Sequence, residues 1–448
     1  MSMKVLALCE RGVKLGEKMG ASEVEVYGIL NSIREVDFTN KIESTRTAVF
    51  AGLGIRLALG KKLGFYSSSQ VTERGVEQAV TKALTLAKIA QPDRDWISFP
   101  TTYGEATVAN IFDKNLKNVT VGTLSEKAVD IMDKVHNFDK RTTITRGSIV
   151  VSEKRVAISN SYNCELERKS TYASSSVTVT AEEAGKKGQS SESGQKRSWH
   201  ENENLELSQK ASERALKMMD AKPIGSGRTS VIWRNEVFAD ILRVMFGRTF
   251  SADAIQKKRS PWMGKIGETI ASENVYILDK GIKNAGLGTR EFDDEGYPQQ
   301  DTPLITKGIL VNYLYDNYTA NKEGKASTGN ASRSYRSTPT PSINNLTLKP
   351  GTAKLEELIK DTKRGLYIHE VIGDWLSNPI SGNLSATVTN GYLIENGELT
   401  QPVKGVIVSA NFFTLIQDEA SLIADDIENS GSTYAPSVKM QKINIIGT

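Results

Sequence analysis

The sequence predicts an α+β protein in which mixed α/β N-terminal and middle domains precede a large β-rich, mostly antiparallel C-terminal domain. A chain of 448 residues is too long for one hydrophobic core, because domains average roughly 150 residues. Strand and helix patterns alternate in the first half, whereas hairpin turns separate successive strands in the second half. We therefore expect domains at residues 1–95, 111–220 and 228–448.

The N-terminal domain is expected to begin with a helix and to continue with strands. Residues 1–20 hold one short apolar run followed at once by charges, which is too short for a signal peptide or a membrane span. We interpret them as an amphipathic helix of a cytoplasmic protein. Residues 23–29 alternate as a half-buried strand does, and residues 53–67 alternate around a hairpin turn at Gly60. Thr72 is then expected to cap a helix with one apolar face.

The middle domain repeats this mixture of elements. Thr123 and Glu126 have the spacing of a capping box, which predicts that a helix begins here. Residues 147–159 and 172–183 alternate in the manner of strands. Residues 184–198 are polar and glycine-rich, and we expect them to form a mobile hairpin tip between the flanking elements.

Strand patterns predominate in the C-terminal domain. Asn396-Gly397 is the strongest short hairpin signal in the chain, and residues 305–309 predict a second tight turn. No repeat of a fixed short period is present.

Composition and charge exclude several functional classes. Hydrophobic residues make up 38% and charged residues 25% of the chain, which is ordinary for a soluble globular protein. The 57 basic and 53 acidic residues nearly cancel, and the absence of a basic stripe with interleaved aromatic residues argues against binding to nucleic acid. Cys9 and Cys164 are far apart, so we expect neither a disulfide framework nor a zinc site built from cysteines.

The most informative segment is residues 229–247, TSVIWRNEVFADILRVMFG. Its β-branched start predicts a strand, and the apolar residues after Asn235 and Glu236 recur with the period of a helix. In zinc peptidases of the HExxH type, two histidines on such a helix bind the metal and the glutamate activates its water. Here the neutral amide of Asn235 and the carboxylate of Asp240 stand where imidazoles would be needed. They also diverge by roughly 140° around a regular helix.

Two interpretations of this helix are open on the residues alone. In the first, Glu236 in the first turn interacts favourably with the helix dipole, while the apolar face belongs to the core. In the second, Glu236 and Asp240 contribute to a metal site with non-standard ligands.

Other polar residues are weaker candidates for a site. His369 belongs to the only His-Glu pair of the chain, but it lies in a β-branched run that predicts a strand, so we expect a packing or solvent-facing histidine. His136 and His200 have no companions at ligand spacing. The acidic residues 291–295 precede a glycine and lack the spacing of a calcium loop, so we expect a solvated turn.

Several segments together resemble the TldD/PmbA family of modulator-of-gyrase and peptide-processing proteins. The resemblance runs nearly end to end and lies in the order and spacing of GASEVEVYG, REVDFTNKIEST, GLGIRLALGKKLGFYSS, GKIGETIAS, residues 290–322 and STGNASR. One branch of this family, TldD, carries an HExxxH motif on a helix and a third metal ligand near the C-terminus. Residues 378–399 and 435–440 resemble the other branch, which is called TldE or PmbA.

The resemblance assigns roles to the helix residues. Asn235 stands in place of the first histidine, Glu236 matches the glutamate, and Asp240 stands in place of the second histidine. It implies that this chain has no catalytic residues, metal ligands or cofactor of its own and keeps a vestigial active-site helix. It also implies a heterodimer with a TldD-type subunit that supplies zinc, in which unfolded peptides are degraded or processed.

Two rival functions are compatible with the same residues. The first is a stand-alone metallopeptidase that uses Glu236, Asp240 and a distant third group. The second is a homodimeric peptide-binding scaffold without a catalytic partner. The metal content of the purified chain and its association with a chain that carries an intact HExxxH motif distinguish these functions.

Overall fold

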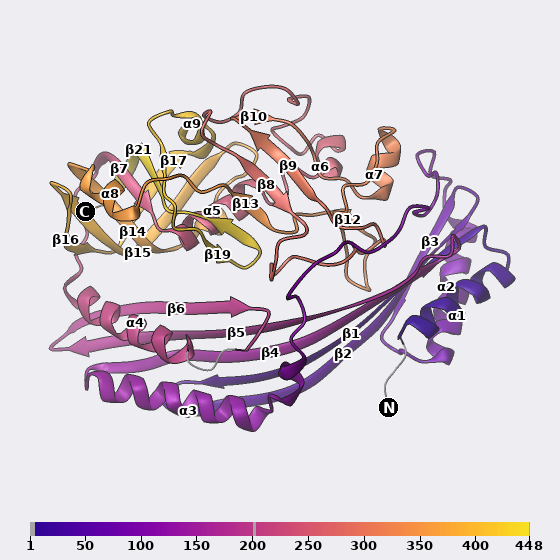
Figure 1. The fold of residues 1–448 in the computed structure, drawn as a ribbon, viewed down its shortest axis with the longest axis horizontal. Helices are drawn as coiled ribbons and strands as arrows, with labels where there is room; N and C mark the ends of the chain where they lie inside the picture. The colour runs from indigo at the N-terminus through magenta and orange to yellow at the C-terminus, as the bar shows by residue number, and fades with distance from the viewer. Residues whose placement is uncertain (1–4, 200–202, 448) are drawn as a thin grey trace.

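The computed structural model describes residues 5–199 and 203–447, and it confirms the α+β class. A long, curved antiparallel sheet carries helices on its outer face, and the β-rich C-terminal domain lies against its inner face (Figure 1). His200 lies outside the described residues. None of the helices formed by the described residues is long and apolar enough to cross a membrane.

The first half of the chain forms one six-stranded sheet with the strand order β3-β2-β1-β4-β5-β6, in which all neighbouring strands are antiparallel. Its strands are β1 (Glu23–Phe38), β2 (Ile42–Leu59), β3 (Lys62–Ser68), β4 (Thr142–Asn160), β5 (Glu165–Glu183) and β6 (Lys186–Lys196). The pairing of β1 with β4 joins residues 1–95 to residues 111–220. The two regions share one sheet, and their separation into two domains stays a prediction.

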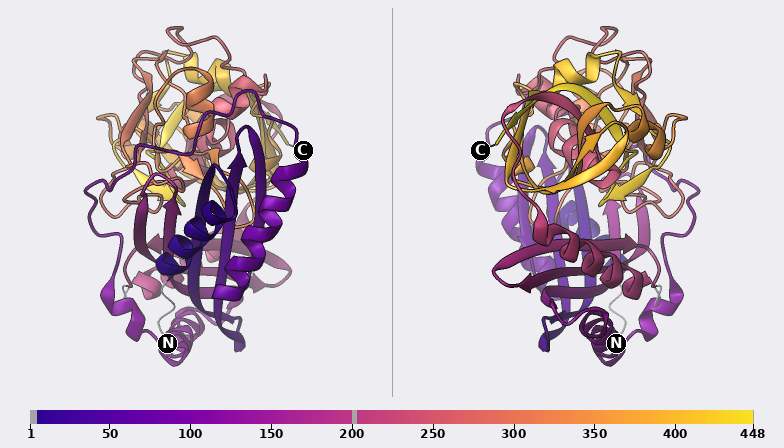
Figure 2. Two further views of the ribbon diagram at one scale, coloured as in Figure 1. Left: turned by 90° about the vertical axis from the view of Figure 1, so that its right-hand side faces the viewer. Right: turned by 90° about the vertical axis from the view of Figure 1, so that its left-hand side faces the viewer.

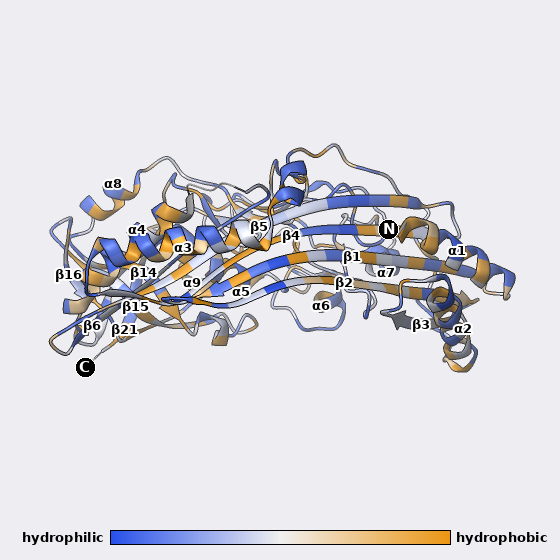
Figure 3. Cartoon of the chain, turned by 90° about the horizontal axis from the view of Figure 1, so that it is seen from below, coloured by the Kyte–Doolittle hydropathy of each residue, from blue (hydrophilic) through white to orange (hydrophobic). Residues whose placement is uncertain are grey.

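The alternation of side chains along the strands gives the sheet two different faces. The outer face is covered by α1 (Val5–Lys18), α2 (Glu73–Ile89), α3 (Val121–Phe138) and α4 (Glu203–Lys217). Val24 and Val26 pack on this face with α1 and α2 at one end of the sheet, and Val36 and Phe38 pack with α3 and α4 at the other (Figure 3). Glu25 and the other residues of β1 that alternate with these outward-facing residues face inward.

One prediction for the middle domain is wrong. Residues 184–198 are not a mobile hairpin tip, because most of them form β6, in which Gly188, Ser190 and Glu192 are buried and alternate with exposed residues. A Cβ atom on Gly188 would approach the carbonyl oxygen of Ala215 in α4 to 2.1 Å. The glycine therefore permits close packing of strand and helix, and small polar side chains conceal this strand in the sequence.

The cap of α3 also differs from the prediction. The Thr123 N–H donates to Thr120 Oγ1 at 3.1 Å, and the Thr120 N–H donates to Thr123 Oγ1 at 3.4 Å. The N-cap is therefore Thr120, and the capping box is built from two threonines instead of Thr123 and Glu126. The prediction for α2 is confirmed, since Thr72 is its N-cap.

The C-terminal domain contains a sheet with the strand order β14-β7-β21-β17-β15-β16 and another with the order β10-β9-β8-β13-β20-β19. An additional pairing of β14 with β15 closes five strands of the first sheet into a ring (Figure 2, right). The strands are β7 (Gly227–Trp233), β8 (Ile277–Lys280), β9 (Asp301–Thr306), β10 (Ile309–Leu310), β11 (Ala331–Ser332), β12 (Thr340–Pro341), β13 (Leu346–Leu348), β14 (Arg364–Ile372), β15 (Asn383–Glu395), β16 (Glu398–Val403), β17 (Val406–Asn411), β18 (Leu422–Ile423), β19 (Glu428–Ser430), β20 (Thr433–Ala435) and β21 (Val438–Ile446). Both predicted hairpins are confirmed, as β9–β10 and β15–β16.

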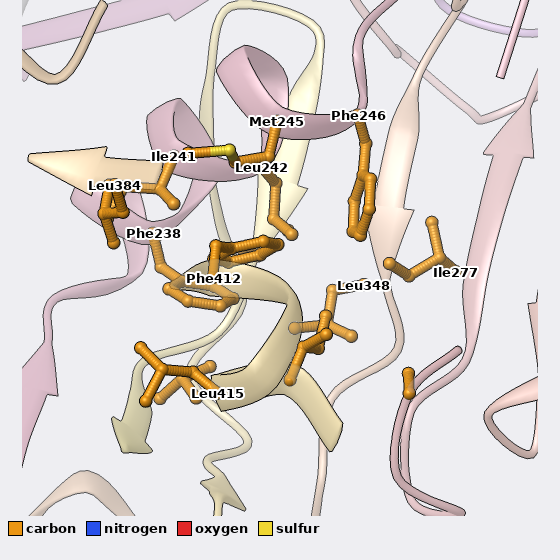
Figure 4. Close-up of a cluster of buried hydrophobic side chains, with 14 of the residues drawn as sticks. Phe238, Ile241, Leu242, Met245, Phe246, Ile277, Leu348, Leu384, Phe412 and Leu415 are labelled. Atoms are coloured by element: carbon orange, nitrogen blue, oxygen red, sulfur yellow. The ribbon is translucent and has the colours of Figure 1, made fainter. Parts of the chain in front are cut away.

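Short helices complete the domain, and one longer helix organises its core. They are α5 (Asn235–Phe246), α6 (Ala252–Gln256), α7 (Asn317–Lys322), α8 (Leu355–Lys360) and α9 (Phe412–Gln417), with a 3-10 turn at η3 (Asp374–Leu376). Two further 3-10 turns, η1 (Lys114–Asn118) and η2 (Met218–Asp220), lie within residues 111–220. Phe238, Ile241 and Met245 on α5 form a buried cluster with Phe412 of α9 and Leu384 of β15 (Figure 4). The predicted transition from a strand to an amphipathic helix is confirmed.

Buried ion pairs attach the C-terminal domain to the inner face of the long sheet. The Arg56 guanidinium on β2 lies 2.8 Å from Glu25 on β1 and 2.8 Å from Glu295 of the C-terminal domain. Arg333 of the C-terminal domain reaches the same Glu25 carboxylate at 2.6 Å. One carboxylate therefore binds guanidinium groups from both parts of the molecule.

The acidic residues 291–295 do not form the predicted solvated turn. Asp294 and Glu295 are only 3% and 2% exposed. Burial alone would raise the pKa of Asp294, but the charges of Arg168 on β5 and of Arg290 outweigh it and hold the pKa below its usual range. Arg168 is 126 residues away from Asp294 in the sequence, so nothing local indicates that this carboxylate is buried.

Arg56→Met is expected to lower the free energy of unfolding by about 3–5 kcal/mol, because it leaves the buried Glu25 and Glu295 without their shared cation. Urea denaturation followed by circular dichroism measures this loss. Arg46→Met is the matched control, since Arg46 is half exposed and its ion pair with Glu35 is screened by water. A loss for Arg56→Met no larger than that of the control would contradict the role of the buried pairs.

Candidate functional site

The candidate site lies at the first turn of α5, where strand β7 ends. Arg234 separates the last strand residue, Trp233, from the first helical residue, Asn235. The apolar face of α5 is fixed in the core, so the side chains of its first turn are held in position. Asn235 Oδ1 accepts a hydrogen bond from the Glu236 N–H at 2.8 Å, which satisfies one of the free donors at the start of the helix.

The Asn235 amide is committed to hydrogen bonds with the C-terminal segment. Its Nδ2 donates to the Asp426 carbonyl oxygen at 2.8 Å and to the Asp426 carboxylate at 3.3 Å. Its backbone N–H donates to Ser437 Oγ at 3.1 Å, and that hydroxyl donates to Asp426 at 2.7 Å. Asn235 therefore links α5 to the C-terminal segment, and its side chain does not point to a free position where a metal could bind.

Glu236 faces a guanidinium group of the same chain. Arg234 Nη2 lies 2.9 Å from the Glu236 carboxylate. Burial raises the pKa of Glu236, and the charge of Arg234 opposes that rise. A glutamate that acts as a general base must reach the proton that it removes. In this chain the carboxylate is engaged with a cation instead.

Arg234 also contacts residues of two other strands. Its Nη1 lies 2.7 Å from His369 Nε2 on β14 and 3.4 Å from Glu192 on β6. Because a guanidinium group only donates, Nε2 accepts this hydrogen bond and the ring proton lies on Nδ1. Burial lowers the pKa of His369 to about 3, so the imidazole is neutral at physiological pH. Arg214 on α4 pairs with Glu192 and extends the network to the outer helices.

Asp240 contacts different residues from those that bind Asn235 and Glu236. Its carboxylate accepts hydrogen bonds from Arg243 at 2.7 Å and from Ser430 Oγ at 3.0 Å. Asn235, Glu236 and Asp240 thus bind different partners. Within residues 5–199 and 203–447, no group of three or more histidine, cysteine, aspartate or glutamate side chains is placed to hold a metal ion. This arrangement does not fit zinc, which needs converging imidazole, thiolate or carboxylate ligands.

The sequence alone did not reveal the residues that surround Glu236. Glu192 lies in the segment that was expected to be mobile, and Arg214 carries no local signal on its helix. Arg234 could have been noticed, because it directly precedes the Asn-Glu pair. His369 is buried, in agreement with the expectation of a packing histidine in a strand.

Comparison with known proteins defines the family. Models described as PmbA/TldA metallopeptidase domain 1, central domain and C-terminal domain match residues 38–87, 114–219 and 226–447. A protein of Methanocaldococcus jannaschii is 31% identical over 431 residues, which cover 96% of this chain and 97% of that protein. The chain belongs to the PmbA/TldD family.

Further comparisons agree with this assignment. A second protein of Methanocaldococcus jannaschii, named a metalloprotease, is 28% identical over 87% of this chain and 86% of its own length. The crystal structure of TldE from Thermococcus kodakarensis has the same fold, with a TM-score of 0.90 at 24% identity over 98% of this chain and 100% of that chain. The resemblance expected from the sequence is confirmed. For this PmbA/TldD family member, the assignment of Asn235, Glu236 and Asp240 to the positions of the metallopeptidase motif stays a prediction.

The buried His369 is expected to make the stability of this family member depend on pH. Its pKa of about 3 in the folded chain lies below the value of about 6.5 for an unfolded histidine, so the unfolded chain takes up the proton first as the pH falls. The stabilising contribution is present above about pH 6.5, is lost progressively toward pH 3, and changes by about 2 kcal/mol between pH 7 and 5. His369→Gln should therefore reduce the loss of stability over that interval.

Urea denaturation at pH 7 and pH 5 measures this effect. His136→Gln is the control, because His136 is exposed on α3 and should leave the pH dependence unchanged. An identical pH dependence in His369→Gln and in the parent chain would show that His369 is not buried in its neutral form.

Proposed function

We propose that this chain is the subunit without a metal site in a TldD-type zinc metallopeptidase complex. In this proposal a TldD-type chain with an intact HExxxH helix binds the zinc, and the heterodimer degrades or processes unfolded peptides. The observation that supports it best is the ion pair between Arg234 and Glu236, which gives the motif carboxylate a guanidinium partner. The likeness in fold to a structure titled TldE supports the same assignment.

The charges around Glu236 argue against metal binding by this chain. Arg234 and Arg214 both pair with Glu192 beside the first turn of α5. A divalent cation placed beside Glu236 would be repelled by the Arg234 guanidinium and would compete with it for the carboxylate. The contribution of this chain to catalysis would then be to confine and orient the peptide and to exclude water from the partner's zinc site.

Two other functions make different predictions. A stand-alone metallopeptidase would require Asp240 to leave Arg243 and Ser430 and would require Glu236 to leave Arg234. A homodimeric peptide-binding scaffold needs no metal and no catalytic partner. The two experiments that follow separate these functions from the proposed one.

The purified chain is expected to hold far less than one zinc ion per molecule, because its motif positions offer an amide and separated carboxylates. Elemental analysis by mass spectrometry after mild purification measures the zinc content. A TldD-type chain purified in the same way is the positive control and should hold about one zinc ion. Stoichiometric zinc in this chain would favour the stand-alone enzyme, and failure to associate with a TldD-type chain would favour the scaffold.

Glu236→Gln should leave peptide turnover by the reconstituted two-chain complex within a few-fold of the parent value. The variant keeps the shape of the side chain and removes only its charge, whereas loss of a true general base costs about 10²–10⁴-fold in rate. The same change in the HExxxH motif of the partner is the positive control and should abolish turnover. A loss of about a hundredfold in Glu236→Gln, with the complex still intact by size-exclusion chromatography, would refute the non-catalytic role.

A further inference from the structure

A cavity between the inner face of the long sheet and the C-terminal domain is lined by cationic side chains. Its volume is about 250 Å³, and Lys154, Arg168, Arg197 and Arg290 contribute to its wall. Glu291 is the one acidic residue in this wall within the described part of the chain. The residues of the first turn of α5 do not line this cavity, so it is separate from the site discussed above.

Strand pairing brings the cations of the sheet together. Lys154 on β4 lies opposite Ser170 on β5, and two positions along the ladder Val156 lies opposite Arg168. Because alternate residues of a strand face the same side, Lys154, Ser170 and Arg168 all face the C-terminal domain. The loop after β8 covers them and adds Arg290.

These cations differ in how their charge is compensated. Arg168 and Arg290 share the Asp294 carboxylate at 2.5 Å and 3.4 Å. Arg197 donates to four backbone carbonyl oxygens and to no carboxylate among the described residues. Lys154 has neither a hydrogen-bond partner nor an ion-pair partner among the described residues. Four cations therefore face two carboxylates, those of Asp294 and Glu291.

The electrostatics of the cavity favour an anionic ligand. Burial lowers the pKa of Lys154, and the charge of Asp294 offsets only part of this effect. The guanidinium groups of Arg168, Arg290 and Arg197 lower the pKa further. Burial also lowers the pKa of Arg197 to about 10. Since buried charges in proteins are normally paired, an anion in the cavity would relieve the repulsion.

We propose that this cavity binds a small oxyanion beside Lys154, Arg197 and Arg290. The oxyanion is either free phosphate or the terminal carboxylate of a peptide. The cavity has room for such a group and several water molecules of roughly 30 Å³ each. It is smaller than the roughly 300–1,000 Å³ of sites for larger organic ligands. This site does not depend on the proposed partner subunit.

Two buried groups in the wall are compatible with this ligand. Arg290 Nε has no hydrogen-bond partner and is a donor that a ligand oxygen or a water molecule can satisfy. Glu291 Oε2 also has no hydrogen-bond partner, and burial raises the pKa of this carboxyl group.

Orthophosphate titrated into the intact chain at constant ionic strength should bind saturably and raise the midpoint of thermal unfolding, because it binds only the folded state. Isothermal and differential scanning calorimetry measure the two effects. Lys154→Met should weaken phosphate binding by about tenfold or more, the effect of losing one charge-assisted hydrogen bond. Without phosphate the same variant should be at least as stable as the parent, since it removes an unpaired ammonium group.

Lys169→Met is the matched control for this experiment. Lys169 is adjacent to Arg168 on β5 but faces the opposite side of the sheet, where it pairs with Glu167 and is 43% exposed. This variant should keep the phosphate affinity of the parent. Equal phosphate affinity in Lys154→Met and the parent would overturn the proposal. The proposal would also be overturned if neither phosphate nor the acid-form peptide described next bound saturably.

A short acetylated peptide with a free terminal carboxylate, and the same peptide with a terminal amide, distinguish the two sources of the oxyanion. Binding of phosphate but of neither peptide supports the site and assigns it to a free anion. Binding of the acid form but not of the amide, with a loss of affinity in Lys154→Met, supports the site and assigns it to a peptide terminus. Equal binding of both peptides to the parent and to Lys154→Met would show that the peptide binds elsewhere and would overturn that assignment.

Discussion

Charge pairing across the inner face of the long sheet fixes how the two halves of the molecule meet. Arg56 on β2 is held between Glu25 of the sheet and Glu295 of the C-terminal domain. Removing these charges from water is costly, and the cost is offset only where the geometry of the pairs is good. Because these contacts are directional, they constrain the relative position of the two halves more than apolar contacts alone would. Every site built from both halves depends on that position.

The first turn of α5 illustrates this dependence. Arg234, which directly precedes α5, pairs with Glu236 and also reaches Glu192, which belongs to β6 of the long sheet. Glu192 is therefore shared by the guanidinium group of Arg214 on α4 and that of Arg234, which precedes α5. Zinc and arginine would make use of the same carboxylate, since each needs a negative charge at short range. Only one of them can be accommodated at this turn.

Structural features that depend on neighbouring residues were predictable from the sequence, whereas features that depend on partners far away in the sequence were not. The Thr72 cap and the Asn396-Gly397 hairpin require only neighbouring residues, and both are present, with φ angles of 51° and 83° at the two hairpin positions. The candidate positions Asn235, Glu236 and Asp240 rest on spacing along one helix and on the family resemblance, and their role stays a prediction. Strand β6 and the acidic residues 291–295 were misjudged, since their burial depends on α4 and on Arg168.

The polar and apolar sides of α5 are constrained in different ways. Phe238, Ile241 and Met245 hold the helix in the core, so its position does not require a metal ion at the first turn. The polar side differs from a metal site in its charge as well as in the type of its ligands, because Arg234 supplies a positive charge beside Glu236. Introducing histidines at Asn235 and Asp240 would supply imidazoles without removing this guanidinium group. The ligands would then be present, but the negative field that attracts a dication would still be compensated by Arg234.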